Sequence, residues 1–297
     1  MRPPRLRYGE TGGNDKVYML IDTHAHVNFK DFQADGDEVI RRSLAADTWM
    51  ILVGSEVKTS KRALEYANKY EKGVYAAVGL HPIHTHEQEA RGEDYEFTTR
   101  EEDFSYDVYE KLAQFKKVVA IGEVGLDYYQ VDAAGDVRAI KQKQKQVFQE
   151  QLKLAHNLKL PVIIHCRQAH DDMLEILKNF KKNFQACLPK DKAWGVMHCF
   201  SGDEELAWQY FNLGLNISFT GLITFSAQWD DLIRRLPSDK FMIETDCPYM
   251  TPEPFRGRRN EPLFVKKVAE RVAEIKNLSF ERIAEISTNN ARQMFKI

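Results

Sequence analysis

The sequence predicts an α/β fold of the (β/α)8 TIM-barrel class. Apolar, β-branched runs alternate with amphipathic helical stretches along the 297 residues, a pattern typical of parallel β/α units. The interval from His24 to Asp246 covers seven such units at about 32 residues each, close to the roughly 30 or more that a βαβ unit needs. Histidines and carboxylates recur where the apolar runs end. A parallel barrel collects its functional groups there, because all eight strands finish on one face.

Eight apolar runs are predicted to form the barrel strands, and each is followed by a helical stretch. The strands are expected at residues 17–22, 48–54, 74–80, 118–122, 161–165, 193–198, 215–219 and 240–245. The helices are expected near residues 35–46, 58–71, 101–116, 138–158, 169–180, 203–213, 226–236, 261–275 and 280–295. The last helix is additional to the eight pairs. Ser279 is its expected N-cap, and Glu281 in its first turn suits the helix dipole.

No linker rich in proline, glycine or serine divides the chain, so residues 17–297 are predicted to form a single domain. Residues 1–16 lack the apolar core of a secretory signal and are expected to be a flexible N-terminal extension. The acidic stretch 87–103 is the least regular segment. It is predicted to be a surface loop or insertion near the rim of the active site. No run is long and apolar enough to span a membrane.

The overall charge bears on the partners that the chain can take. Lys and Arg number 42 and Asp and Glu number 44, which gives a formal charge of −2. This balance argues against a protein that coats a nucleic-acid duplex by bulk electrostatics, and it leaves open nucleic acid bound at a local site. The hydrophobic fraction of 43% and the charged fraction of 29% are those of an ordinary soluble globular protein.

The four cysteines show no C-x-x-C spacing, so neither a structural zinc site nor a thioredoxin-like motif is expected. Cys166, Cys199 and Cys247 each follow a candidate metal ligand directly. Since successive strand side chains point to opposite faces, these thiols are expected to point outward against the helices as small buried apolar groups. That interpretation suits a reducing cytoplasm. A nucleophilic thiol of low pKa is the weaker alternative.

Six residues that can ligate a metal share one position, at the end of a predicted strand. They are His24, His26, Glu123, His165, His198 and Asp246. Any one of them alone could be a buried core histidine or a surface carboxylate. Four imidazoles and two carboxylates that converge at one barrel face instead indicate a two-metal hydrolase centre.

The chemical types of the six candidate ligands also suggest which of them share a cation, which can bridge two cations and which can accept a proton. Two residues apart on an extended chain, His24 and His26 face the same way and can share one ion, while Asp22 lies one layer deeper and could brace a ligand. Glu123 has two oxygens and can bridge two cations about 3.5–4 Å apart. Asp246 follows the eighth strand, beside the first. It can bind the same ion as the two histidines and accept a proton from water. A hydroxide formed by metal-lowered water pKa is the expected nucleophile.

These motifs resemble those of the TatD family of metal-dependent deoxyribonucleases, within the amidohydrolase-like TIM barrels. The resemblance runs in order over about residues 18–297 and leaves out 1–16 and parts of 87–103. The matching segments are IDTHAH at 21–26, VGLHP at 78–82, IGEVGLDY at 121–128, VIIHCR at 162–167, HCFSG at 198–202, ETDCPY at 244–249, RGRRNEP at 256–262 and NAR at 290–292.

The resemblance implies two divalent metal ions per subunit. The first would be held by His24, His26 and Asp246 with Glu123 bridging, and the second by Glu123, His165 and His198. Asp246 and Glu123 are thereby implied as catalytic residues. The metal identity stays open between zinc, manganese and magnesium, although histidine ligands suit magnesium less well.

The resemblance also implies a substrate pocket lined by His81, Asp127, Arg167 and Tyr249. Arg167 is the natural phosphate contact, because a guanidinium matches phosphate oxygens bidentately. His81 could orient a scissile phosphate or be a rim histidine, and Asp127 could hold a ligand histidine or bind substrate. The basic cluster 256–259 could bind a nucleic-acid backbone or be a solvated loop. Aromatic residues that could stack a base are Tyr128, Phe200, Phe225 and Tyr249, with core packing equally expected for the two phenylalanines.

Three functions are consistent with this sequence. The leading hypothesis is a cytoplasmic metal-dependent hydrolase that cleaves phosphodiester bonds in single-stranded DNA or at strand ends, as an exonuclease. The alternative is hydrolysis of an ester or amide, including D-aminoacyl-tRNA, by the same metal-bound hydroxide. The third is a nucleic-acid-binding scaffold with structural metals. Membrane partners are not expected, and the sequence does not indicate the oligomeric state.

Overall fold

Eight parallel strands form one sheet in the order β1-β2-β3-β6-β7-β8-β9-β10. The computed structural model describes residues 18–91, 96–129, 131, 136–189 and 192–297, so the predicted extension at 1–16 lies outside the described residues. The first and last strands meet at their carboxyl ends, where Ala25 and Cys247 form a parallel bridge. Hydrogen bonds from His26 N to Cys247 O (2.9 Å) and from Asp246 N to His24 O (2.9 Å) complete this junction. The predicted TIM barrel is confirmed.

All eight predicted strands are present. They are β1 Leu20–Ala25, β2 Thr48–Val53, β3 Val74–Val78, β6 Val118–Asp127, β7 Val162–Arg167, β8 Gly195–Met197, β9 Leu215–Phe219 and β10 Phe241–Ile243. The largest difference from prediction is at β6, which continues five residues beyond the predicted end at residue 122. A register shift between Ile121 and Val124 lets β6 resume its pairing with β7, as far as Asp127 opposite Arg167. This continuation carries Glu123 and Asp127 within one strand.

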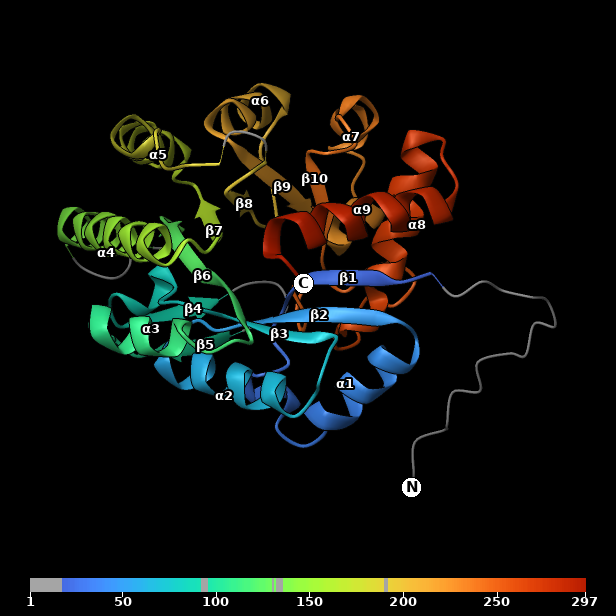
Figure 1. Ribbon diagram of the computed structural model, residues 1–297, viewed down its shortest axis with the longest axis horizontal. Coiled ribbons are helices and arrows are strands. Elements are labelled where there is room, and N and C mark those ends of the chain that lie inside the picture. The colour runs from blue at the N-terminus through green and yellow to red at the C-terminus, as the bar shows by residue number, and fades with distance from the viewer. Residues whose placement is uncertain (1–17, 92–95, 130, 132–135, 190–191) are drawn as a thin grey trace.

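Helices surround the strands, as Figure 1 shows. They are α1 Gly36–Ala45, α2 Val57–Asn68, α3 Tyr106–Ala113, α4 Val137–Leu158, α5 His170–Phe184, α6 Glu204–Leu213, α7 Asp230–Arg235, α8 Val265–Lys276 and α9 Phe280–Phe295. Ser279 caps α9 as predicted, accepting a hydrogen bond from Arg282 N. The helix α3 begins later than predicted. The carboxylate of Glu102 instead accepts hydrogen bonds from Val57 N, at the start of α2.

The segment predicted as an irregular loop at 87–103 contains secondary structure of its own. Strands β4 (Gln88–Arg91) and β5 (Glu96–Thr99) pair antiparallel and stand apart from the barrel sheet. The prediction of an insertion after the third strand is therefore right in place, and the prediction of irregular structure is wrong. Ile83 and His84, in the 3-10 turn Pro82–His84 that precedes this hairpin, line the cavity described below.

Alternating strand residues divide the core into two parts. Residues such as Leu20, Met50 and Leu52 face the helices. Residues such as Ile21 and Ile51 fill the barrel, together with side chains near the end of α9. The members of this inner cluster are Ile21, Ile51, Val53, Ala77, Val119, Ala120, Ile163, Val196, Met242, Ala291, Met294 and Phe295. The end of α9 therefore closes the floor of the barrel, and Figure 1 shows α9 lying across the strands with the C-terminus near their centre.

Substituting Phe295 by alanine is expected to lower the free energy of unfolding by about 3 kcal/mol, because it leaves a cavity under the barrel. The Phe295 side chain is almost fully buried among the inner cluster. Urea unfolding of the variant and the wild type measures the difference. A change below about 0.5 kcal/mol, the range of ordinary surface substitutions, would show that the end of α9 does not stabilise the barrel.

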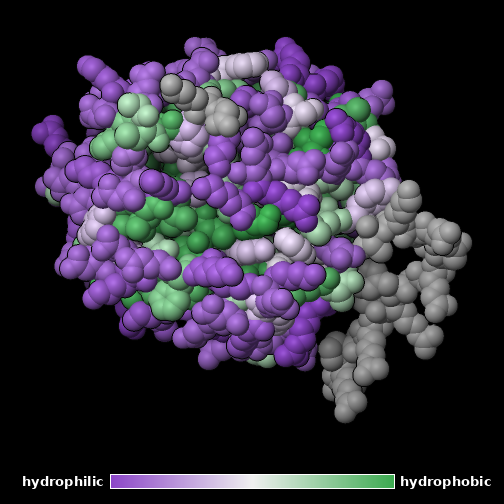
Figure 2. All heavy atoms as spheres, in the orientation of Figure 1, coloured by the Kyte–Doolittle hydropathy of each residue, from purple (hydrophilic) through white to green (hydrophobic). Residues whose placement is uncertain are grey.

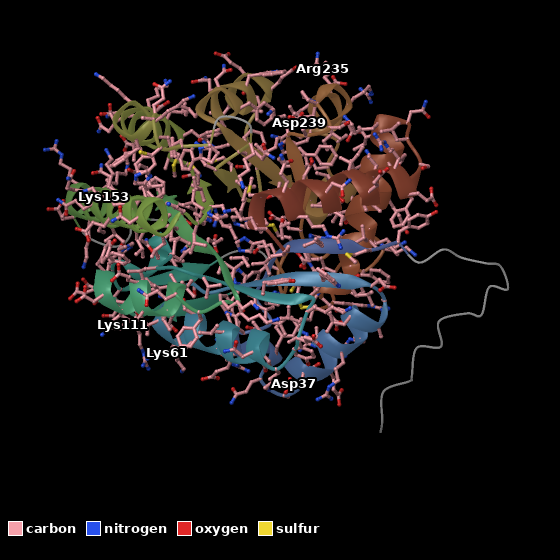
Figure 3. The ribbon with its side chains drawn as sticks, in the orientation of Figure 1. Asp37, Lys61, Lys111, Lys153, Arg235 and Asp239 are labelled. Carbon is pink, nitrogen blue, oxygen red and sulfur yellow. The ribbon has the colours of Figure 1, made fainter. Side chains whose placement is uncertain are left out.

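The outer surface carries the charged residues. Lys61, Lys111, Lys153 and Arg235 point away from the barrel in Figure 3, and the face drawn in Figure 2 is mostly hydrophilic with hydrophobic side chains in limited bands. Among the described residues, no helix combines the length and the apolar character needed to cross a membrane.

Candidate metal centre

A cavity of about 740 Å³ opens at the carboxyl ends of the barrel strands, a volume typical of a ligand site. His24 lies fully buried beside this cavity, with its ring stacked on that of His198 at 3.8 Å between centroids. The structure therefore brings all ten predicted site residues to one place. The nine that line the cavity are His26, His81, Glu123, Asp127, His165, Arg167, His198, Tyr249 and Asp246.

Glu123 lies at the centre of this site, and its two carboxylate oxygens face different groups. Its Oε2 is 3.4 Å from His24 Nε2 and 3.6 Å from His26 Nε2. Its Oε1 is 2.9 Å from His165 Nδ1 and 3.1 Å from His198 Nε2. Burial alone would raise the pKa of Glu123, but the surrounding histidines, His81 and His198 foremost, lower it well below its ordinary value. The carboxylate is therefore charged and can bridge two cations.

The first group of donor atoms comes from the two ends of the barrel sheet. The Nε2 atoms of His24 and His26 are 3.1 Å apart, and Asp246 Oδ1 lies 3.7 Å and 3.3 Å from them. Ligands about 2.1 Å from one cation are separated by roughly 3–3.5 Å. His26 Nδ1 donates to Val53 O (2.8 Å), so its Nε2 offers a lone pair to this group. The donor set fits a divalent cation.

The second group consists of Glu123 Oε1, His165 Nδ1 and His198 Nε2. The remaining ring nitrogens face carboxylates: His165 Nε2 is 3.0 Å from Asp127 Oδ2, and His198 Nδ1 is 3.1 Å from Glu244 Oε1. Carboxylates in this position orient a metal-ligating histidine and raise its basicity. Burial alone would lower the pKa of His165, but its hydrogen bonds to Asp127 and Glu123 raise it to about 9. This donor set also fits a cation.

Glu244 is the buried carboxylate that the sequence analysis missed. Its Oε1 accepts hydrogen bonds from His198 Nδ1 (3.1 Å) and Cys199 N (2.7 Å). Glu244 also falls in a possible ligand group with His24 and His198. We assign it an orienting role, because this oxygen already accepts two hydrogen bonds. A signal was present in the sequence, since Glu244 precedes Asp246 by two residues just as Asp22 precedes His24.

Asp22 lies one layer below the candidate ligands, as predicted. Its Oδ1 accepts hydrogen bonds from His24 N (3.2 Å) and Thr245 N (2.8 Å), and its Oδ2 accepts one from Thr245 Oγ1 (2.5 Å). Asp22 therefore ties the backbone of the first histidine to the segment that carries Asp246. It braces the main chain rather than a histidine ring.

His81 differs from the other histidines of the cavity. Its Nδ1 accepts a hydrogen bond from Ile83 N (3.1 Å), so the neutral ring carries its proton on Nε2, which lies 3.3 Å from Glu123 Oε1. Burial lowers the pKa of His81 to about 4, which keeps the ring neutral. His81 is therefore a hydrogen-bond donor at the cavity wall, a role that suits the orientation of an anionic substrate.

The remaining predicted substrate residues occupy distinct positions. Asp127 accepts hydrogen bonds from His165 and from Tyr129 N (2.9 Å), so its contacts are those of an orienting residue. The Arg167 guanidinium lies 3.6 Å over the Tyr129 ring at the cavity wall. Tyr249 lines the cavity, and its backbone is fixed there because Tyr249 N donates to Asp246 O (3.0 Å).

The structure separates the residues that the sequence left ambiguous. Phe200 is buried in the core, whereas Phe225 is exposed and lines the cavity. In the cluster 256–259, Arg256 also lines the cavity, but Arg259 forms a bidentate ion pair with Asp35 (2.9 and 2.6 Å), the N-cap residue of α1. Arg259 therefore anchors the loop 256–259 to Asp35, and Arg256 is the member of the cluster that faces the cavity.

The four cysteines all lie within the described residues and are unpaired. Cys247 is buried, as expected of a thiol that faces away from the centre. Cys166 Sγ is 3.3 Å from His170 Nδ1 on α5, but Cys166 also lines the cavity. The prediction is wrong for Cys199. Its φ of 45° breaks the strand alternation, so this residue lines the cavity and its Sγ contacts Met250 Sδ at 3.3 Å. Burial raises the pKa of Cys199 to about 12, which argues against a nucleophilic thiolate.

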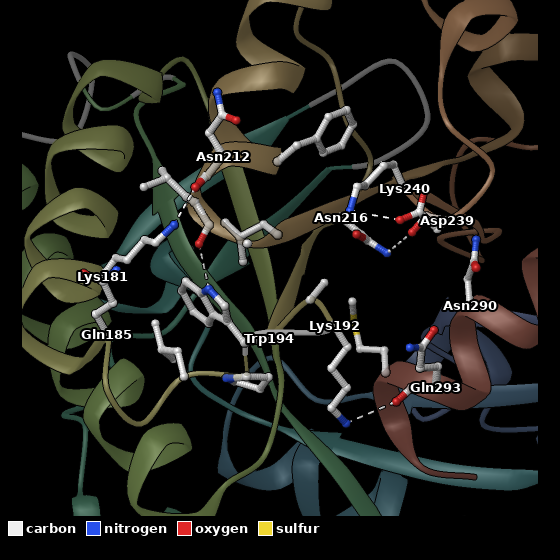
Figure 4. A pocket seen from close by; sticks show the side chains of 18 residues that line it. Lys181, Gln185, Lys192, Trp194, Asn212, Asn216, Asp239, Lys240, Asn290 and Gln293 are labelled. Atoms are coloured by element: carbon white, nitrogen blue, oxygen red, sulfur yellow. Dashed lines mark hydrogen bonds and ion pairs between the residues drawn. The ribbon is translucent and has the colours of Figure 1, made fainter.

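A second cavity, of about 510 Å³, lies at the opposite ends of the strands, near the starts of β8 and β9. Figure 4 shows its polar wall, with Lys181 bound to Asn212 O and Lys192 bound to Gln293 O. None of the ten predicted site residues is among the described residues that line it. The candidate chemistry is therefore confined to the carboxyl face of the barrel.

A parallel barrel with histidines and carboxylates grouped around one shared carboxylate defines a metal-dependent hydrolase. A family model described as "TatD related DNase" matches residues 21–296. The chain therefore belongs to the TatD family, and it is a metal-dependent hydrolase.

Individual relatives agree with this assignment. The chain is 39% identical over 282 residues to the "Uncharacterized metal-dependent hydrolase YabD" of Bacillus subtilis, covering 94% of this chain and 100% of that protein. It is 31% identical over 284 residues to the "3'-5' ssDNA/RNA exonuclease TatD" of Pantoea ananatis, covering 93% and 99%. The crystal structure of YJJV, a TatD homolog from Escherichia coli, superposes with a TM-score of 0.78 at 30% identity, covering 95% and 100% of the two chains.

Substituting Glu244 by glutamine is expected to weaken cation binding at the second group by about 10- to 100-fold, because His198 loses the carboxylate that orients its ring. Titration with zinc or manganese against a chelator of known affinity measures the change. Glu285→Gln, on the exposed face of α9, is the matched control. If Glu244 were itself a ligand, the substitution would abolish one bound cation rather than weaken its affinity.

Proposed function

We propose that this chain is a two-cation phosphodiesterase that removes nucleotides from the end of single-stranded DNA. The observation that carries the proposal is the position of Glu123, whose two oxygens face two separate groups of nitrogen and oxygen donors. Centres that use two metal ions hold them about 3.5–4 Å apart and clamp both the attacking and the leaving oxygen of a phosphoryl group. The name of the Pantoea ananatis relative supports the choice of single-stranded nucleic acid as the substrate.

The two groups of donors would each hold one divalent cation, which we propose to be zinc, manganese or magnesium. The first cation would bind His24, His26 and Asp246, the second would bind His165 and His198, and Glu123 would bind both. When bound, these cations supply a lowered water pKa and neutralise negative charge on the phosphate. The four unpaired cysteines support a reducing, cytoplasmic environment for the enzyme.

The chain's own residues position the substrate and move the proton. His81 donates from Nε2, and Arg167 from its guanidinium, to the non-bridging oxygens of the scissile phosphate. Asp246 accepts the proton of the attacking water, since its carboxylate lies at the border between the first group and the cavity. Asp127 holds the His165 ring in place. Tyr249, beside Asp246 at the cavity wall, contacts the nucleotide.

The test is a cleavage assay with end-labelled DNA. Single-stranded oligonucleotides that carry a label at either end are incubated with protein and magnesium, manganese or zinc ions, and the products are separated by length. The expected result is EDTA-sensitive, stepwise shortening from one end of the strand. If no chelator-sensitive cleavage occurs with any of the three cations, while D-aminoacyl-tRNA is deacylated, the substrate assignment is wrong and the ester-hydrolysis alternative replaces it.

A further inference from the structure

One aromatic side chain that lines the cavity is exposed to solvent. Of the described residues, the large hydrophobic side chains that are exposed are Phe115, Trp208, Phe225 and Leu278. Phe225, which is 40% exposed, is the member of this set that lines the cavity of the metal centre. The cations and phosphate of the proposed reaction need no phenyl ring. An exposed aromatic ring at such a place can instead bury its face against a flat ligand.

The loop that carries Phe225 is held firmly in place. Phe225 follows the 3-10 turn Gly221–Thr224 after β9. Thr224 Oγ1 donates to Gly221 O (2.6 Å) and accepts from Glu253 N (2.9 Å), in the loop after β10. A side chain at Gly221 would collide with the carbonyl of Met250, so the two loops can approach closely only with glycine there. The ring is therefore presented by two interlocked loops, and little ordering is needed when it binds a ligand.

A cation accompanies the ring. The guanidinium carbon of Arg256 lies 4.0 Å from the centroid of Phe225, and both residues line the cavity. A guanidinium plane stacks on aromatic rings and attracts phosphate at the same time. Phe225 and Arg256 together offer a flat surface with a positive charge, which matches a nucleobase joined to a phosphate.

This surface is continuous with the metal centre. Met250, whose carbonyl abuts Gly221, contacts Cys199 Sγ through its sulfur at 3.3 Å, and Cys199 directly follows the proposed ligand His198. On the same side, Tyr249 N donates to the carbonyl of the proposed ligand Asp246. The part of the cavity wall between the proposed cation groups and Phe225 is thus formed by residues that neighbour two of the proposed ligands. A nucleotide whose phosphate lies at the centre has this wall beside it.

We propose that Phe225, backed by Arg256, is the site on which a base of the substrate stacks while the neighbouring phosphodiester is cleaved. The inference rests on the proposed function and narrows it. The site selects single-stranded nucleic acid, because a base must be unstacked and unpaired to lie on the ring. It also selects against phosphodiesters that have no base. Since every base has an aromatic face, discrimination among the four bases is expected to be weak.

The experiment compares two substrates in five proteins. One substrate is a single-stranded oligonucleotide, and the other carries abasic residues in place of the two nucleotides at the end that is attacked. The proteins are the wild type, Phe225→Ala, Phe225→Trp, Arg256→Lys and Phe115→Ala. Phe115 is the matched control, because it is 52% exposed and lies outside the cavity. For each pair, kcat and KM are measured by cleavage, and Kd by fluorescence anisotropy in EDTA.

The expected results separate base stacking from a structural effect. Phe225→Ala raises KM and Kd for the ordinary oligonucleotide by roughly 5- to 100-fold and changes kcat little. For the abasic substrate, KM and Kd of this variant stay within about twofold of the wild-type values. Phe225→Trp restores binding of the ordinary oligonucleotide, and Phe115→Ala behaves as wild type. Arg256→Lys, which keeps the charge and loses the planar group, weakens binding of the ordinary oligonucleotide more than that of the abasic one.

Two outcomes overturn the inference. In the first, Phe225→Ala changes KM and Kd equally for both substrates. In the second, it changes neither quantity for either substrate. In both cases, cleavage by the wild type would still support the proposed function. Conversely, a wild type that cleaves neither substrate while Phe225→Ala selectively weakens binding of the ordinary oligonucleotide would refute the proposed function and support the base site. The binding measurement in EDTA therefore tests the base site whether or not cleavage is observed.

Discussion

Replacing Glu123 by glutamine is expected to lower kcat/KM for single-stranded DNA by at least about 10⁴-fold, the scale on which catalytic groups that act as a unit fail. Glutamine keeps the shape of the side chain but removes the negative charge, and one of its two terminal atoms becomes an NH2 group that cannot ligate a cation. In the wild type, each oxygen of Glu123 faces a different donor group. The variant is therefore expected to lose at least one cation as well as activity.

Two measurements check the Glu123→Gln prediction. Metal analysis of the purified protein gives the number of bound cations, and the cleavage assay gives kcat/KM. Circular dichroism shows whether the barrel is intact, and Glu285→Gln on the exposed face of α9 controls for a simple loss of charge. Two bound cations together with activity within tenfold of wild type would contradict the bridging role of Glu123.

Replacing Asp246 by asparagine is expected to lower kcat by about 10³-fold with a smaller change in KM, because the substitution removes the proton acceptor, and general bases of this kind contribute about 10²- to 10⁴-fold. Asparagine keeps one carbonyl oxygen, so the first group retains a weaker oxygen donor beside His24 and His26. The second group does not include Asp246 and is expected to keep its cation. Loss of activity with partial retention of metal distinguishes this variant from Glu123→Gln.

The measurement for Asp246→Asn is a full saturation curve at several cation concentrations. Excess cation is expected to refill the first group without restoring kcat. If saturating manganese or zinc restores kcat to the wild-type value, Asp246 acts only as a ligand, and the proton acceptor must be another group of the cavity.

The barrel fold could be predicted from the sequence because each strand is buried on both its inner and its outer face. Such a strand appears in the sequence as a short apolar run. The sequence was also sufficient to gather the ligands, since strand ends meet at one face whatever the details of the helices. It was insufficient for β6, where the register shift at residues 121–124 depends on how β6 meets β7 and leaves no mark in apolar periodicity.

Local conformation explains the other differences between sequence and structure. Cys199 has a left-handed backbone, so the alternation expected of a strand does not apply to it. Whether His81 donates or accepts depends on its contact with Ile83 N in the following turn, which no residue pattern reports. Glu244 was missed for another reason. Its role depends on the hydrogen bond from His198, 46 residues away, and the sequence alone does not bring these two residues together.

The junction of β1 with β10 has a consequence for biosynthesis. His24 is synthesised 222 residues before Asp246, and the floor-closing end of α9 follows later still. The amino-terminal part of a chain is made first, and a domain folds as a unit. A growing polypeptide thus lacks a complete first donor group until Asp246 has been synthesised, and the centre is complete only after the eighth strand has joined the first.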